Sequence, residues 1–465
     1  MSAATTARSE RHFVVARPDG AFSAPEVLLL REPGGWALPR WESEEQRSAD
    51  VAEINRAARE QLGVEVTVLR CLRDEPGAAD GVRRQIYDVG TPRPAWSPPA
   101  HGRWFAQADL DAVALARPEQ RTILESWFEE RQARRQPADG RDWDLPGWRD
   151  QVIDWVEGEL SRRGLGRVSA TEQVRVWEFS HVLRLRAAEG EFYFKALPHA
   201  GAAEPRLTRW LAELYPSLMP AVVATEPDRR WLLMKASQGP ALMDVRDLSR
   251  WEQAAEGCAR MQLDCVGRAR ELLALGCPER PLEWLEAEID PLLGDTAAMQ
   301  PQDAEALKNG EIERLRRRGP ELRAMCRELA GYAVPLSIEP GDLWGVNVIA
   351  GDQACVFIDW EDASVSHPFF SPFLLLASLD YTDALAHAPD ARSRIRQAYL
   401  APWREREPIR NWPAGRLELA FDVAQSLAAV HYAVQFRRFA LPRIETSWEV
   451  RAFVALFLRR LVTEA

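Results

Sequence analysis

A segment near the middle of the second half of the chain constrains the fold most. Residues 336–361 read LSIEPGDLWGVNVIAGDQACVFIDWE, in which two short β-rich runs, 346–349 and 354–358, flank a tight-turn sequence. This pattern predicts a β-hairpin. Because the two strands of a hairpin run in opposite directions, Asn347 at its beginning and Asp359 at its end are expected to lie at the same end.

Asp342 precedes the first of these strands, on a loop that also contains Gly341. An amide oxygen and a carboxylate beside a further carboxylate suit Mg²⁺, which takes a few oxygen ligands from protein and leaves the remaining positions for water and phosphate. The segment therefore predicts a metal site with a neighbouring base. The structural alternative is a hairpin with ordinary turn Asp and Asn residues.

The spacing Asp-x-x-x-x-Asn followed by Ile-Asp-Trp-Glu resembles the catalytic segment of the aminoglycoside phosphotransferase and choline kinase group of protein-kinase-like enzymes. The resemblance implies that Asp342 accepts the proton of a substrate hydroxyl, while Asn347 and Asp359 hold the Mg²⁺ ions that bridge the phosphates of ATP. The chain departs from the pattern of the group at two supporting positions. Pro340 stands where the group has His, and Ser371 stands where it tends to have Asp.

Alternation with period two predicts a strand meander between residues 173 and 198, with strands at 173–178, 181–187 and 191–197. By the same resemblance this is the sheet that covers the nucleotide, with Lys195 as its phosphate-binding residue. A buried ammonium needs an anionic partner, and the expected one is Glu204, at the start of a helix over 205–214. Because Pro205 disfavours a helical conformation at Glu204, an N-cap role is the alternative.

Two further parts of a nucleotide site follow from the resemblance. The turn Trp-Glu-Phe-Ser at 177–180 contains no Gly, and Ser180 is the candidate for contacting a phosphate, with an ordinary hairpin turn as the alternative. The apolar strand at 231–235 leads into a polar loop, where the backbones of Met234 and Ala236 are expected to bind adenine.

The remainder of this region is predicted to be helical. Helices are expected over 248–263, over 268–330 with interruptions at Pro281 and Pro291, and over 373–463 apart from 402–413. Four acids at 283, 286, 288 and 290 either face a cationic substrate or form a solvated helix face, and the second interpretation is favoured.

The first part of the chain has a different pattern. Strands are predicted at 12–16, 27–30, 65–69 and 83–89, with a Pro-Asp-Gly turn at 18–20 and helices at 48–62 and 118–132. The sequence Gly-Trp-Ala-Leu-Pro at 35–39, followed by a helix that ends at Gly63, resembles the Nudix hydrolase fold.

The catalytic signature of that fold is incomplete here. In register with Arg-Glu-x-x-Glu-Glu-x-Gly, only Arg56, Glu60 and Gly63 match, while Ala57 and Gln61 have no carboxylate to bind metal. A fold reused for docking, ligand sensing or dimer contacts is expected instead of a hydrolase.

Composition limits the remaining choices. The net charge of −11 disfavours nucleic acid as a partner, and no apolar run is long enough to span a membrane. We expect a soluble cytoplasmic protein whose six cysteines are free thiols. Lys occurs only at 195, 235 and 308 among many Arg residues, which draws attention to Lys195.

The sequence thus predicts a multi-domain α+β protein. A Nudix-like α/β/α sandwich at 10–132, without hydrolase activity, precedes a linker at 133–146 and a bilobal kinase-like fold with a β-rich N-lobe at 147–239 and a helical C-lobe at 240–465. The predicted function is ATP- and Mg²⁺-dependent phosphorylation of a small-molecule hydroxyl. The alternatives are a pseudokinase-type module that binds nucleotide for regulation, and a Nudix hydrolase with a kinase-like regulatory tail.

Overall fold

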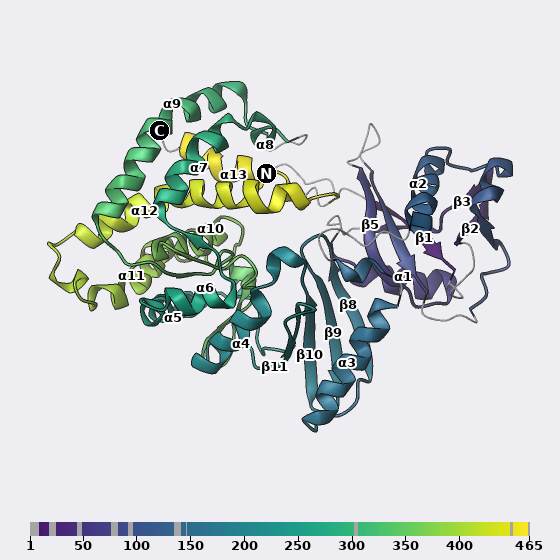
Figure 1. The fold of residues 1–465 in the computed structure, drawn as a ribbon, viewed down its shortest axis with the longest axis horizontal. Helices are drawn as coiled ribbons and strands as arrows, with labels where there is room; N and C mark the ends of the chain where they lie inside the picture. Colours follow the sequence, from purple (N-terminus) through teal and green to yellow (C-terminus); the bar gives the residue numbers. More distant parts are fainter. Residues whose placement is uncertain are drawn as a thin grey trace. The chain divides into compact units, whose positions relative to one another are not determined.

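The computed structural model describes residues 9–17, 25–43, 49–75, 82–91, 96–133, 141–145, 147–301, 306–446 and 450–463. The chain divides into two compact units (Figure 1): Met1–His199 with Ile444–Glu449, and Ala200–Arg443 with Val450–Ala465. The predicted α+β class is confirmed, because long strands form much of the first unit whereas helices form most of the second. Among the described residues, no helix is long and apolar enough to cross a membrane.

A seven-stranded mixed sheet forms the first part of the first unit. Its main order is β3-β2-β1-β6-β5, with β4 paired to β1 and β7 paired to β2, and β1 runs parallel to β6. The strands are β1 (Ser9–Ala16), β2 (Glu26–Glu32), β3 (Gly35–Ala37), β4 (Arg40–Ser43), β5 (Thr67–Glu75), β6 (Arg83–Gly90) and β7 (Gly102–Ala106). The four predicted strands correspond to β1, β2, β5 and β6. The predicted turn at 18–20 lies outside the described residues.

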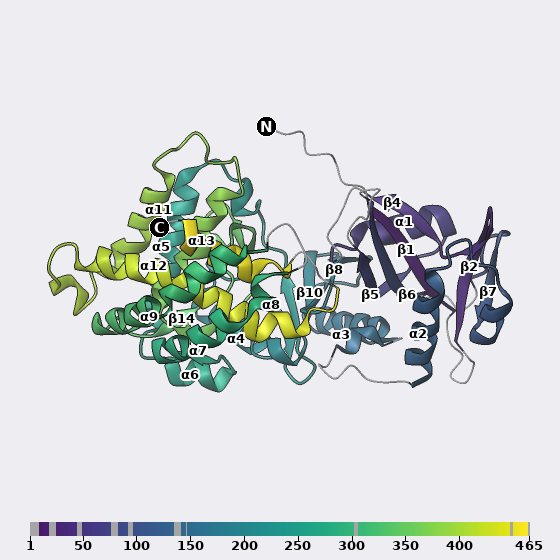
Figure 2. The ribbon, with the colours of Figure 1, turned by 90° about the horizontal axis from the view of Figure 1, so that it is seen from above.

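Two helices lie on opposite sides of this sheet (Figure 2), α1 (Ala52–Leu62) and α2 (Gln120–Ala133). Helix α2 buries Leu124, Trp127 and Phe128 in a hydrophobic cluster with residues of the sheet. Helix α1 ends as predicted at Gly63, which has a left-handed φ of 66° and donates its N–H to the carbonyl of Arg59. Glycine adopts this conformation without a steric penalty.

The rest of the first unit contains an antiparallel meander and one helix. The strands β8 (Ala170–Val176), β9 (His181–Ala187) and β10 (Gly190–Ala196) confirm the predicted period of two. Helix α3 (Trp148–Arg162) places the rings of Trp148 and Trp155 each 6.0 Å from the ring of Phe194 in β10. These two tryptophans of α3 therefore pack against the meander.

Hydrogen bonds fasten the seven-stranded sheet domain to strand β8. The N–H of Val176 donates to the carbonyl of Ala49 at 3.0 Å. The side chain of Gln173 exchanges two hydrogen bonds with the backbone of Val68 in β5, at 2.8 and 2.9 Å. Within the predicted linker at 133–146 the structure describes 141–145, where Trp143 is only 2 % exposed, so this stretch is packed into the unit.

The second unit has one large hydrophobic core surrounded by helices. They are α4 (Glu204–Leu214), α5 (Leu248–Cys265), α6 (Ala269–Leu275), α7 (Leu282–Gly294), α8 (Thr296–Met299), α9 (Asn309–Gly331), α10 (Pro372–Ala377), α11 (Ala391–Arg404), α12 (Arg416–Gln435) and α13 (Phe453–Thr463). The prediction that Pro291 interrupts a helix is wrong, because it lies inside α7. The apolar side chains of Leu285, Ile289 and Leu292, which are buried on both sides of the proline, hold the helix together.

Short strands complete the second unit. Strands β11 (Val222–Glu226) and β12 (Trp231–Lys235) pair antiparallel, and β13 (Glu279–Arg280), β17 (Ser364–Ser366) and β14 (Ser337–Glu339) form a three-stranded sheet. Strands β15 (Val348–Ala350) and β16 (Cys355–Phe357) form the predicted hairpin, with Val348 opposite Phe357. This hairpin positions the candidate site.

Candidate functional site

The loop between β14 and the hairpin is shaped by Gly341. This residue has a φ of 83°, in the left-handed region, and a Cβ atom added to it would lie 2.4 to 2.5 Å from atoms of Asp362. Only glycine satisfies both conditions. The sequence Pro-Gly-Asp therefore brings the segment that carries Asp342 against the segment that follows Asp359.

Asp342 and Asn347 are in direct contact. The side-chain Nδ2 of Asn347 donates to Oδ2 of Asp342 at 2.7 Å and to the carbonyl oxygen of Asp342 at 3.0 Å. The N–H of Trp344 also donates to that carbonyl, at 2.9 Å. These bonds fix the loop and hold the carboxylate of Asp342, which is half-buried, in one orientation.

Asp359 follows β16 at the same end of the hairpin as Asn347. The N–H of Ile358 donates to the carbonyl of Asn347 at 3.0 Å, which closes the hairpin end as the sequence predicts. Asp359 has a φ of 67°, one of three positive values among the described non-glycine residues. Asp tolerates this conformation better than most residues, and such strain is often found at functional positions.

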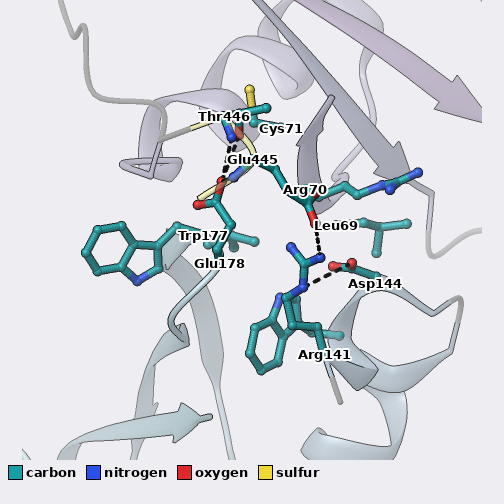
Figure 3. A pocket seen from close by; sticks show the side chains of 11 residues that line it. Leu69, Arg70, Cys71, Arg141, Asp144, Trp177, Glu178, Glu445 and Thr446 are labelled. Atoms are coloured by element: carbon teal, nitrogen blue, oxygen red, sulfur yellow. Dashed lines mark hydrogen bonds and ion pairs between the residues drawn. The ribbon is translucent and has the colours of Figure 1, made fainter. Parts of the chain in front are cut away.

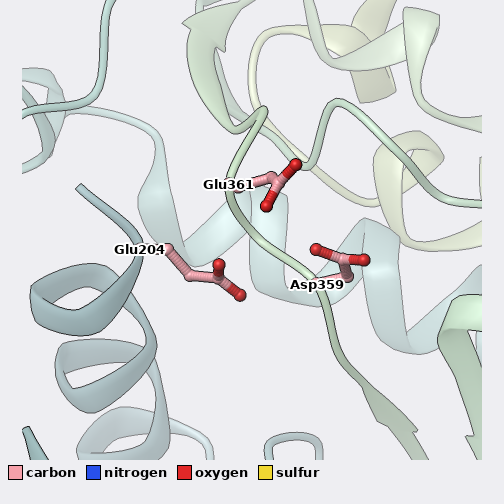
Figure 4. Close-up of side chains that lie close together, drawn as sticks. All are labelled: Glu204, Asp359 and Glu361. Carbon is pink, nitrogen blue, oxygen red and sulfur yellow. The ribbon is translucent and has the colours of Figure 1, made fainter. Parts of the chain in front are cut away.

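Three carboxylates converge next to this hairpin end (Figure 4). One oxygen from each of Glu204, Asp359 and Glu361 lies within 4.8 Å of the others. Glu204 is the first residue of α4, and its Oε1 accepts the N–H of Trp360 at 3.1 Å. Helix α4 thus presents Glu204 to the segment 359–361, and Ala203, rather than Glu204, occupies the N-cap position.

The chemistry of this cluster fits a hard divalent cation. All of its donors are carboxylate oxygens, which Mg²⁺ prefers, and three like charges at this separation repel unless a cation lies between them. Glu204 and Asp359 were singled out in the sequence. Glu361 was not, although it is the Glu of the Ile-Asp-Trp-Glu motif.

A buried network supports the loop from the side of β14. The carboxylate of Glu339, with no exposed surface, accepts the N–H of Gly341 and the hydroxyl of Tyr432, each at 3.0 Å, and lies 3.6 Å from Nε2 of His431. Burial raises the pKa of Glu339, but the adjacent imidazole of His431 and the hydrogen bonds from Gly341 and Tyr432 outweigh it, so the pKa lies below its usual value. Glu339 is therefore an ionised support of the loop, at a position next to Pro340.

A second network surrounds Ser371, where the resembled group tends to have Asp. The amide Nε2 of Gln262 donates to Oγ of Ser371 at 2.8 Å and to the carbonyl of Ile338 at 3.0 Å. The hydroxyl of Tyr399 donates to Oε1 of Gln262 at 2.6 Å. All of these side chains are buried, so uncharged groups link Ser371 to strand β14. Neither network is predicted from the sequence, because its members are far apart in the chain.

Lys195 and Ser180 lie in the first unit. Lys195 is in β10, opposite Val182 of β9, and is 7 % exposed. Ser180 is buried, and its Oγ accepts the indole N–H of Trp177 at 2.9 Å, so the turn at 177–180 is closed by its own side chains. Whether Lys195 pairs with Glu204 stays a prediction.

The turn that contains Ser180 is also held from outside (Figure 3). The buried carboxylate of Glu178 accepts the backbone N–H groups of Glu445 and Thr446, at 2.9 and 2.7 Å. The guanidinium of Arg141 pairs with Glu445 at 2.5 Å. A segment from near the C-terminus thus fixes a turn more than 260 residues earlier in the chain.

The remaining predicted residues can be placed briefly. Met234 is half-buried near the end of β12, paired with Val222 of β11, and Ala236 follows that strand. The acids of α7 favour the interpretation as an ordinary charged helix face, because Glu286, Glu288 and Asp290 each pair with Arg residues of the second unit. The six cysteines are free, and burial raises the pKa of Cys277 and Cys326 to about 12.

Comparison with known proteins gives similarities of structure only. No protein-family model and no curated protein matches the chain. Among solved structures, the chain is similar to a macrolide 2′-phosphotransferase from Brachybacterium faecium, with 16 % identity, a TM-score of 0.43, and coverage of 66 % of this chain and 98 % of that chain. A putative fructosamine-3-kinase from Thermobifida fusca shows 19 % identity and a TM-score of 0.42, covering 67 % of this chain and 100 % of that one. A choline kinase from Cryptosporidium parvum shows 12 % identity and a TM-score of 0.46, covering 68 % of this chain and 96 % of that one.

Proposed function

We propose that the chain is an ATP- and Mg²⁺-dependent phosphotransferase that phosphorylates a hydroxyl of a small molecule. One observation carries the proposal. Asp342, oriented by Asn347, is part of the loop that leads into hairpin β15–β16, and at the same end of that hairpin Asp359 converges with Glu204 and Glu361. A base beside a cluster of oxygen ligands is the minimum arrangement for phosphoryl transfer to an alcohol.

Asp342 is proposed as the catalytic base. Its carboxylate takes the proton of the acceptor hydroxyl as that oxygen forms a bond to the terminal phosphorus of ATP, and the bond from phosphorus to the leaving oxygen of ADP breaks. Asn347 keeps the carboxylate oriented through its Nδ2, which leaves its Oδ1 for a cation. Among the described residues no hydrogen bond to that Oδ1 is formed.

The carboxylates of Asp359, Glu361 and Glu204 are proposed to hold Mg²⁺, together with Asn347. When bound there, Mg²⁺ neutralises charge on the phosphates of the nucleotide. We propose Lys195 and Ser180 as further contacts for the phosphates, and the backbones of Met234 and Ala236 as contacts for adenine. These assignments rest on the sequence resemblance.

The test is a pair of substitutions of aspartate by asparagine. Asp342→Asn is expected to reduce ATP-dependent phosphorylation, across a panel of hydroxyl compounds that includes sugars, amino alcohols and antibiotics, by at least about a hundredfold while nucleotide affinity stays within about twofold. Asp352→Asn changes an exposed aspartate in the turn of the same hairpin and serves as the control. Unchanged turnover in Asp342→Asn, measured with an acceptor that the wild type phosphorylates, would refute the assignment.

One observation favours a second candidate, a pseudokinase-type module that binds nucleotide for regulation. The turn at 177–180 has no Gly, and the hydroxyl of Ser180 is engaged by Trp177. For this candidate, ATP with Mg²⁺ raises the melting temperature, yet no acceptor in the panel is phosphorylated and no slow ATP hydrolysis depends on Asp359.

The region 10–132 is proposed to have a Nudix-like fold without hydrolase activity. On α1, Ala57 and Ala58 are buried against the domain core, at positions with no carboxylate. Metal-dependent cleavage of a nucleoside diphosphate derivative by the full chain, abolished by Glu60→Gln, would contradict this part of the proposal.

A further inference from the structure

A polar cavity in the first unit is lined by none of the residues proposed for phosphoryl transfer or nucleotide binding. It has a volume of about 340 Å³ and lies where α1, the beginning of α3 and β8 meet. Three arginines line it, Arg56 and Arg59 from α1 and Arg149 from α3. Two acids also line it, Glu65 and Glu172, so the lining alone carries an excess of one positive charge.

Both acids already have cationic partners. Glu65 pairs with Arg59 at 3.2 Å, and Glu172 accepts a hydrogen bond from Nε of Arg184 at 3.1 Å. Arg56 lies 3.7 Å from Glu53. Both carboxylates of the lining therefore pair with arginines other than Arg149.

Arg149 is the arginine of the lining that forms no ion pair within the described part of the chain. It is half-buried, and among the described residues no carboxylate lies within ion-pair distance of its guanidinium. Its Nε is buried and has no hydrogen-bond acceptor within the described part of the chain. Burial lowers the pKa of this guanidinium, while Glu65 and Asp150 oppose the shift. A buried Nε–H without an acceptor costs folding free energy, and an anion in the cavity that accepts from it would offset that cost.

We propose that this cavity binds a phosphate-bearing small molecule, with the guanidinium of Arg149 as the principal contact and Arg59 and Arg56 at its sides. Guanidinium groups match the oxygens of phosphate in pairs of parallel hydrogen bonds. The hydroxyl of Thr171 in β8 also lines the cavity and can donate to the ligand. A volume of about 340 Å³ accommodates a diphosphate or a small phosphate ester.

The position of the cavity gives it a structural role. Its walls come from the seven-stranded sheet domain, through α1, and from the meander that contains Lys195, through β8. Asn55 of α1 lines the cavity and also donates to Gln173 of β8 at 3.2 Å. A ligand bound there contacts both parts of the first unit and stabilises their junction.

Isothermal titration calorimetry of the full chain with inorganic pyrophosphate tests the proposal. The buffer contains EDTA and no Mg²⁺, so that a metal-dependent nucleotide site does not bind the pyrophosphate. The wild type is expected to bind one pyrophosphate, and Arg149→Gln to lower the affinity at least about tenfold. Arg149→Lys keeps the charge but loses the paired donors, so we expect the affinity for pyrophosphate to fall less, by several-fold. Arg162→Gln is the matched control, since Arg162 lies on the same helix and pairs with Glu159.

Two outcomes would overturn the proposal. One is no measurable binding of pyrophosphate or orthophosphate by the wild type. The other is equal affinity in the wild type, Arg149→Gln and Arg149→Lys, each with an unchanged circular dichroism spectrum. Citrate is the comparison anion, and binding of citrate without binding of phosphate counts as the first outcome. None of these results depends on whether the chain is a phosphotransferase.

Discussion

The substitution Tyr432→Phe probes the carboxylate of Glu339, which supports the loop that carries Asp342. The hydroxyl of Tyr432 donates to Oε1 of Glu339 at 3.0 Å and lies 3.3 Å from the carbonyl oxygen of Phe370. Glu339 is fully buried, so the lost donor cannot be replaced by bulk water. A hydrogen bond to a buried charge contributes about 2 kcal/mol, which lowers the melting temperature of a unit of this size by about 4 to 8 °C.

A second tyrosine supplies the matched control. The hydroxyl of Tyr399 donates to Oε1 of Gln262 at 2.6 Å and lies 2.9 Å from the carbonyl oxygen of Pro368, and both of these acceptors are neutral. Tyr399→Phe is therefore expected to cost about 1 kcal/mol and about 2 to 4 °C. Differential scanning calorimetry of the full-length variants at neutral pH measures the difference.

The pH dependence provides an independent check of the same reasoning. The folded-state pKa of Glu339 is below its usual value, so its contribution to stability is present above the pKa of an unfolded Glu and decreases as the pH falls below it. The difference in melting temperature between Tyr432→Phe and Tyr399→Phe should therefore become smaller at acidic pH. If Tyr432→Phe is no more destabilising than Tyr399→Phe at neutral pH, Glu339 is not held as an anion and the argument fails.

Three further predictions follow from single contacts. Gly341→Ala forces a Cβ against Asp362 at a positive φ, and we expect loss of several kcal/mol in unfolding experiments and loss of any phosphotransfer activity. Burial raises the pKa of Asp144 to about 7, so the contribution of this group to folding stability falls as the pH rises from about 4 to 7. The substitution Asp144→Asn should therefore raise the melting temperature relative to wild type more at about pH 8 than at about pH 4. Glu178→Gln weakens the acceptor of two backbone N–H groups, and faster hydrogen exchange at Glu445 and Thr446 is the expected result, with an unchanged rate as the contradicting one.

The parts that the sequence predicts well are those fixed by neighbours along the chain. The hairpin β15–β16 has a tight turn between two β-rich runs, so its pairing and the common end of Asn347 and Asp359 follow from local pattern. The helix end at Gly63 depends in the same way on residues within a few positions. Such features need no knowledge of distant contacts.

The parts that it misses depend on distant residues. Strands β3, β4 and β7 are short, and pairing with β1 and β2 stabilises them more than their own composition does. The convergence of Glu204 with Glu361 requires α4 to lie against a segment more than 150 residues later, which no periodicity encodes. Strand β8 likewise lies beside α1 through contacts between distant residues, such as the hydrogen bonds of Gln173 with the backbone of Val68 in β5.

Buried contacts around the loop that carries Asp342 explain why two departures from the resembled pattern do not by themselves argue for an inactive protein. At Pro340, where the resembled group has histidine, the neighbouring Glu339 accepts the N–H of Gly341 and the hydroxyl of Tyr432 of α12. At Ser371, where that group tends to have aspartate, Gln262 of α5 links the serine to β14. At each of these positions a buried group from another helix supports the loop before Asp342. The argument for a pseudokinase therefore rests on the turn at 177–180 alone, where the hydroxyl of Ser180 accepts the indole N–H of Trp177 but keeps its own proton to donate to a phosphate oxygen.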